Sequence, residues 1–212
     1  LVRNHIPQFE IVLPGRISVP PAYSVVINRA LDYLNDFLCN KYGLTHAIPR
    51  VSSPTKNDNV KIFLGSEYYS KVDKNQVAAD KKKFKGNPGC AIRTRGKNIY
   101  IYGGQNNYAN EARGIVNGIY VWLENNTDEI LVQIPGATRW NKTPLSIFEF
   151  DKSGNMDAIW GKDYVNAPLL QYWSLTGSNK TYSDRNMSVP DDWHLGHWDY
   201  AGRRQHTCSH WW

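Results

Sequence analysis

The sequence contains little cysteine, and its cysteines form no recognisable pattern. Only Cys39, Cys90 and Cys208 occur among the 212 residues, and none of them belongs to a CxxC motif. Three cysteines allow at most one internal disulfide, which excludes a fold held together by a disulfide framework. A chain of this length can instead bury a hydrophobic core. It suits one large domain, or one domain of about 150 residues with an attached element.

Long apolar runs and low-complexity segments are also absent. No stretch approaches the ~18 to 20 uninterrupted apolar residues of a membrane-spanning helix, so we expect no membrane span. Hydrophobic residues make up 41% of the chain and charged residues 21%, which is typical of a soluble globular protein.

Charges of one sign are rarely clustered, although the net charge is +6. The dense basic cluster is Lys81, Lys82 and Lys83 with Lys85, in a polar stretch that we expect to be a loop or the exposed end of a helix. No recognition-helix or RNP-like pattern accompanies this cluster. A solvated surface is therefore the better interpretation, and we predict no nucleic-acid partner.

Apolar runs and alternation predict four strands in the first half of the chain. Short apolar runs that end in glycine predict strands at residues 9–15 and 60–65. Residues 90–104 alternate apolar and polar side chains on both sides of the four residues 95–98. This pattern predicts two antiparallel strands joined by a hairpin.

Apolar spacings of three and four predict two amphipathic helices, one from Ser24 to near Gly43 and one over Asn110–Asn126. The residues expected to face the sheet include Ile27, Leu31, Leu34, Phe37, Ile115, Ile119 and Leu123. Two apolar helix faces need a common partner, so the sequence predicts an α/β fold. We expect a mixed sheet packed with two main amphipathic helices, in two or three layers, over residues 1–145.

The remaining residues 146–212 differ in composition and show less regular apolar spacing. We expect loop, a short strand candidate at 146–150, polar linker over 151–166, and one more apolar strand candidate at 167–175. An irregular tail rich in Trp and His follows. It has aromatic surface but too few aliphatic residues for a core of its own, so it must pack on something else.

Several of these segments together resemble a known family. Gly103 and Gly104 end a strand, and a helix with Gly114, Gly118 and Tyr120 follows. The helix continues with Leu123 and Glu124, and a loop carries Arg139, Trp140 and Pro144. In these features the chain resembles the N-terminal α/β domain of beta-N-acetylhexosaminidases, alpha-glucuronidases and related bacterial glycan-degrading proteins. The resemblance covers roughly residues 9–175.

The resemblance implies that a (β/α)8 barrel begins at residues 167–175. At the position where the family often carries a sugar-contacting arginine stands Gln171 or Tyr172, so we expect no sugar contact from that strand. A complete barrel needs about 250 residues, and only 45 follow Ala167. We therefore expect a non-catalytic accessory domain, or a fragment, of a glycoside-hydrolase-like, carbohydrate-associated protein. Its barrel would be missing or supplied by a partner chain, and the resemblance implies a secreted or periplasmic location.

The C-terminal twenty residues concentrate side chains that could bind a ligand. Four of the six histidines and four of the eight tryptophans lie in 193–212. Indole faces stack on pyranose rings, while His and Arg donate hydrogen bonds to hydroxyls, so an oligosaccharide or polysaccharide is one expected partner. The candidate carbohydrate-binding residues are Trp193, His194, His197, Trp198, Arg203, His206, His210 and Trp211.

Two other interpretations of the tail remain open. His194, His197, His206, Cys208 and His210 could converge on zinc, although their spacing matches no established zinc pattern. Alternatively, the aromatic side chains pack against a missing domain or a partner chain. The protein as a whole could accordingly be a stand-alone carbohydrate-binding protein, or a metal-binding or oligomeric structural protein.

Other catalytic chemistry finds little support in the sequence. Adjacent Asp191 and Asp192 cannot easily flank a glycosidic bond from opposite sides, and no nucleophile triad is evident from spacing. Gly103 and Gly104 lack the full GxGxxG pattern, which favours a tight turn over a phosphate-binding loop. We expect no cofactor, and no catalytic residue in this chain alone.

Overall fold

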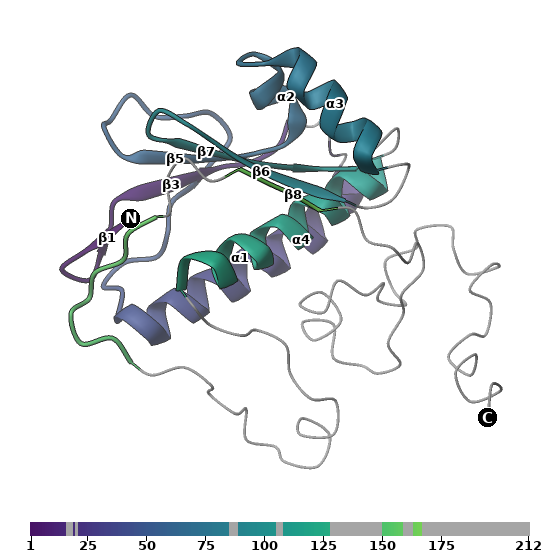
Figure 1. Ribbon diagram of the computed structural model, residues 1–212. Helices are drawn as coiled ribbons and strands as arrows, with labels where there is room; N and C mark the ends of the chain where they lie inside the picture. Colours follow the sequence, from purple (N-terminus) through teal and green to yellow (C-terminus); the bar gives the residue numbers. More distant parts are fainter. Residues whose placement is uncertain are drawn as a thin grey trace, which may run out of the picture.

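The computed structural model describes residues 1–15, 19, 21–84, 89–104, 108–127, 150–158 and 163–166. These residues build a sheet with helices on both faces, as Figure 1 shows. None of the described helices combines the length and the apolar character that crossing a membrane requires.

The central sheet is mixed and has the strand order β4-β3-β5-β7-β6-β8. Its strands are β3 (Phe9–Val12), β4 (Arg50–Val51), β5 (Val60–Leu64), β6 (Cys90–Arg95), β7 (Asn98–Gly103) and β8 (Tyr164–Asn166). Strands β4, β3, β5 and β7 run parallel, whereas β6 is antiparallel to both of its neighbours. A separate two-stranded sheet pairs β1 (Val2–Arg3) with β2 (Ile6–Pro7). The predicted α/β class with a mixed sheet is confirmed.

Two long helices, α1 (Pro21–Tyr42) and α4 (Tyr108–Thr127), cover one face of the sheet, and α2 (Ser66–Ser70) and α3 (Lys74–Phe84) cover the other. The fold is therefore three-layered. All seven helix residues predicted to face the sheet are buried: Ile27, Leu31, Leu34, Phe37, Ile115, Ile119 and Leu123. They share one hydrophobic core with Ile62, Ile99 and Ile101 of the sheet, which confirms the predicted packing.

Strand β7 shows why the central strands are apolar on both sides. Ile99 and Ile101 belong to the core under α1 and α4, whereas Tyr100 and Tyr102 belong to a second core under α2 and α3. Successive side chains of a strand point to opposite faces. Because helices cover both faces, every position between Ile99 and Tyr102 is buried.

Glycines let α4 approach the sheet at close range. A Cβ atom on Gly103 of β7 would lie 2.3 Å from the Cα of Gly114, and one on Gly114 would lie 2.2 Å from the carbonyl oxygen of Gly89. A Cβ on Gly118 would lie 2.4 Å from a methyl group of Ile101. Gly103, Gly114 and Gly118, which contribute to the family resemblance, therefore serve helix–strand packing. The residues that would form the expected turn, 105–107, lie outside the described part of the chain.

The structure differs from the expectations in two segments. The polar stretch after β5 forms helices α2 and α3, which the sequence analysis does not predict. Lys81, Lys82 and Lys83 lie in the last turn of α3, so the alternative of an exposed helix end holds for Lys82 and Lys83. Lys81 is only partly exposed, because its amino group contacts the buried residues Ser66 and Glu111.

The predicted linker over 151–166 also contributes to the fold. Met156 forms a β-bridge with Val2, and residues 164–166 form β8, the outermost strand next to β6. These contacts are between backbones, which hydrophobic periodicity does not reveal. The strand candidates at 146–150 and 167–175 lie outside the described residues, apart from Phe150, which is in no strand.

Candidate functional site

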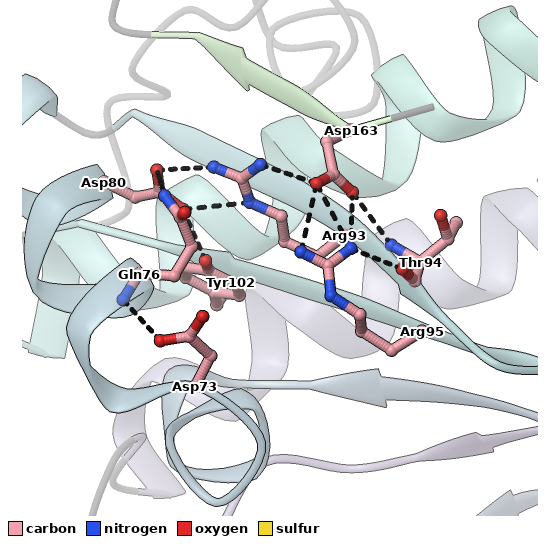
Figure 2. A network of polar contacts seen from close by, with 8 residues as sticks. All are labelled: Asp73, Gln76, Asp80, Arg93, Thr94, Arg95, Tyr102 and Asp163. Carbon is pink, nitrogen blue, oxygen red and sulfur yellow. Dashed lines mark hydrogen bonds and ion pairs between the residues drawn. The ribbon is translucent and has the colours of Figure 1, made fainter. Parts of the chain in front are cut away.

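A network of charged side chains lies between the sheet and α3 (Figure 2). At its centre is Arg93 of β6, whose Nε and Nη2 donate to the carboxylate of Asp80 at 3.1 and 2.6 Å. Its Nη1 donates to Asp163 at 2.8 Å. Both Asp80 and Arg93 are buried. One guanidinium therefore joins a helix, a central strand and the residue that precedes β8.

Two further polar side chains, the buried Tyr102 and the partly exposed Gln76, complete the surroundings of Asp80. The hydroxyl of Tyr102 donates to Asp80 at 2.6 Å, and the side-chain amide of Gln76 donates at 2.9 Å. Burial raises the pKa of Tyr102, and the neighbouring Asp80 charge raises it further. Burial alone would lower the pKa of Arg93, but its hydrogen bonds to Asp80 and Asp163 raise it above its ordinary value. The tyrosine therefore stays neutral and the arginine stays charged.

Asp163 receives donors from three consecutive residues of β6. Besides Arg93, the backbone N–H of Thr94 donates to it at 3.2 Å, and Nη1 and Nη2 of Arg95 donate at 3.2 and 3.3 Å. Burial would raise the pKa of Asp163, yet the hydrogen bonds from Arg93 and Thr94 hold it below its usual value. The carboxylate is thus charged at neutral pH, and the network is balanced between two arginines and two aspartates.

A second cluster lies at the edge where the parallel strands end. The chain leaves β3 towards α1 on one face and leaves β5 towards α2 on the other (Figure 1). In α/β sheets such a divergence is where ligands commonly bind. Here the N–H of Ser66 donates to Glu111 at 3.0 Å, and the amino group of Lys81 donates to Ser66 Oγ at 2.9 Å and to Glu111 at 3.1 Å. Burial raises the pKa of Glu111 although Lys81 opposes the shift.

The same edge holds a second glutamate. The N–H of Gly15 donates to Glu67 Oε1 at 2.6 Å, and Glu67 Oε2 is buried without a hydrogen-bond partner. Gly65 has φ +113° there, and a Cβ on it would lie 2.4 Å from Glu67 Oε2. Two carboxylates, a lysine and a serine therefore gather at this edge. Three of them, Ser66, Lys81 and Glu111, are engaged with one another.

A third buried ion pair fixes the loop before β5. Glu10 accepts hydrogen bonds from the N–H and the hydroxyl of Thr55 at 2.8 and 2.6 Å, and the amino group of Lys61 lies 3.4 Å away. Burial would raise the pKa of Glu10, but the Thr55 hydrogen bonds and the Lys61 charge lower it. Its neighbours thus keep this buried carboxylate ionised.

The sequence analysis does not predict the charge network around Arg93, although the position of Asp80 in the sequence points to a buried ion pair. Asp80 stands three residues after Val77 and four before Phe84, on the same face of α3, and all three are buried. A carboxylate on an apolar helix face requires a partner. Arg93 follows Ile92 in β6, a pattern that would normally place the arginine in solvent, and it is buried because α3 covers that face of the strand. The distant Asp163 has no such local signal.

The carbohydrate-binding candidates named from the sequence all lie outside the described residues. This applies equally to the alternative zinc ligands of the tail. Within the part of the chain that the structure describes, no group of three His, Cys, Asp or Glu side chains could hold a metal ion. The candidates in the tail therefore remain predictions.

Comparison with known proteins provides no further identification: no family model matches the chain, and no curated protein matches it.

Proposed function

We propose that residues 1–166 contain a non-catalytic accessory domain of a glycoside-hydrolase-like, carbohydrate-associated protein. The observation that carries this proposal is the close contact between β7 and α4 at Gly103 and Gly114. These glycines belong to the motif by which the sequence resembles the accessory domain of glycan-degrading proteins. Their role here is to bring a helix against a strand, which is the task of a scaffold.

The buried charges support the same proposal. Arg93, Lys61 and Lys81 each pair with a carboxylate that is at least nine-tenths buried: Asp80, Glu10 and Glu111. Glycoside hydrolysis needs two carboxyl groups that face each other across a substrate, about 5 to 9.5 Å apart. Carboxylates that are held by cations inside the fold instead hold its strands and helices together. We infer that these groups serve the rigidity of the domain.

Under this proposal, carbohydrate contact belongs to the chain that follows β8. The tail carries Trp193, Trp198 and Trp211 together with histidines and Arg203, a combination suited to stacking on sugar rings and to bonding hydroxyl groups. The accessory domain would then support this segment, and a barrel or a partner chain would complete its surroundings. A secreted or periplasmic setting is part of the same proposal.

Titration with a panel of oligosaccharides, followed by tryptophan fluorescence, tests the carbohydrate association. We expect a saccharide-dependent change that persists in the presence of a chelator. Substituting Trp193 and Trp198 by Ala should abolish the change, whereas Trp122→Phe in the α4 core should retain it. A change that disappears with chelator would instead support a metal site. No response to any saccharide would contradict a sugar-facing tail.

A further inference from the structure

Strand β6 presents a set of donors that converge on one carboxylate. Arg93 and Arg95 alternate with Thr94, so their side chains leave the same face of β6, and the Thr94 N–H lies between them along the strand. All three donate to Asp163, as Figure 2 shows. Charged hydrogen bonds of this kind are roughly twice as strong as neutral ones. The donors therefore form a defined receptor for a carboxylate.

The two positive charges of the receptor, on Arg93 and Arg95, are balanced only when Asp163 is present in addition to Asp80. Asp80 already neutralises Arg93, through two hydrogen bonds at 2.6 and 3.1 Å. Arg95 adds a second positive charge, and the only carboxylate that the described residues place on it is Asp163. Removing Asp163 would leave an excess cation beside a buried ion pair. The Arg95 side chain is 41% exposed, so water screens part of its charge. Two neighbouring guanidinium groups nevertheless favour an anion at this position.

Aromatic rings form a rigid wall for the receptor. The Arg95 guanidinium lies over the ring of Tyr69, 5.5 Å from its centroid. Tyr69 stacks in turn on Tyr102, with ring centroids 5.6 Å apart, and meets the edge of Tyr100. Tyr69 is fully buried, and its hydroxyl has no hydrogen-bond partner. The rings restrict the rotamers of Arg95 and so preorganise its donors.

Asp163 precedes a short edge strand. Strand β8 has three residues, which pair with Cys90, Ala91 and Ile92 of β6. It is the outermost strand of the sheet. A strand of three residues at a sheet edge is at the short end of what proteins use. Tyr164 packs against one core and Val165 against the other. The carboxylate immediately before β8 adds a charged attachment to this packing and to the short ladder.

We propose that Arg93, Arg95 and the Thr94 N–H form a carboxylate-binding site that Asp163 occupies, so that this residue latches β8 to the sheet. The latch holds an outermost strand of the described sheet in place. It goes beyond the accessory role and does not depend on it, because it would operate whatever the following segment binds.

Chemical rescue of the full chain tests the latch. In Asp163→Gly, hydrogen exchange of the amides in residues 163–166 and on the adjoining β6 should become about tenfold faster or more, because charged hydrogen bonds are lost. Adding sodium acetate should restore protection in a concentration-dependent manner, compared with sodium chloride at equal ionic strength. Asp163→Asn, a milder change, should also exchange faster, because an amide group presents its own donors to the arginines.

Two variants control for non-specific effects. Asp157→Gly removes the exposed partner of Arg3, and its exchange in β6 and β8 should not respond to acetate. Adding Arg95→Met to Asp163→Gly should reduce the rescue. Wild-type exchange in both Asp163 variants would overturn the proposal. Equal protection by acetate in all variants, or by chloride, would also overturn it. Circular dichroism establishes that each variant retains the fold, and hydrolysis plays no part in the readout.

Discussion

At the scale of single residues, Arg93 illustrates why the identity of a side chain matters more than its charge. Its planar guanidinium donates through two nitrogens to Asp80 and through the third to Asp163. A lysine ammonium is a point charge and cannot reproduce this fork. Asp80 is fully buried, so the loss of the fork would leave a carboxylate without its principal partner.

We predict that Arg93→Met lowers the free energy of unfolding by ~3 to 5 kcal/mol, as expected when one partner of a buried ion pair is removed. Arg93→Lys should recover only part of the loss. The matched control is Arg50→Met, which removes a pair with the largely exposed Asp32 and should cost about 1 kcal/mol or less. Urea unfolding measures all three variants. Equal, small losses for Arg93→Met and Arg50→Met would show that the network contributes little to stability.

At the scale of secondary-structure elements, the strongly periodic segments are the ones that the sequence predicts. Helices α1 and α4 have apolar residues at spacings of three and four, and each has the predicted face buried. Helix α3 buries only a narrow stripe, made of Val77, Asp80 and Phe84. Because most of its other residues are polar, the apolar spacing is too weak to predict a helix. Strand β8 has three residues. It is placed by its ladder with β6, by the packing of Tyr164 and Val165 and by Asp163, and three residues are too few to show a period in the sequence.

The close contact between α4 and β7 predicts that replacing a glycine of α4 by alanine destabilises the protein, although alanine has the higher helix propensity. Gly114→Ala should gain ~1 kcal/mol from propensity alone. Its new Cβ, however, would lie 2.2 Å from a backbone oxygen, and we expect a net loss of about 2 kcal/mol or more. Gly96→Ala is the control, since it has φ +57° but no neighbouring atom within 4 Å, and should lose only about 1 kcal/mol. Thermal unfolding that leaves Gly114→Ala as stable as the wild type would refute the tight contact.

At the scale of the whole molecule, paired carboxylates link separate elements and make stability depend on pH. The pKa values of Glu10 and Asp163 are lowered in the folded state. Their contribution is therefore present above the unfolded pKa, near 4, and is lost as pH falls through the folded pKa. Glu111 has a raised pKa, so its protonation at low pH favours the folded state and acts in the opposite direction.

We accordingly predict that the unfolding temperature falls as the pH decreases below about 4. The double variant Glu10→Gln with Asp163→Asn should be less stable at pH 7 and should lose less stability on acidification than the wild type. Glu111→Gln should make the acid loss steeper, because the opposing proton uptake is removed. Scanning calorimetry between neutral and acidic pH provides the test. Identical pH profiles for the wild type and the double variant would contradict this assignment.

The central claim is that this α/β fold is a scaffold and does not itself carry out glycoside hydrolysis. The most direct measurement is hydrolysis of a panel of aryl glycosides by the purified 212-residue chain. We predict no release of the aryl group above that of buffer, and no change with Glu67→Gln, Glu111→Gln or Asp163→Asn. Turnover that a single one of these substitutions abolishes, while circular dichroism shows the fold intact, would contradict the account.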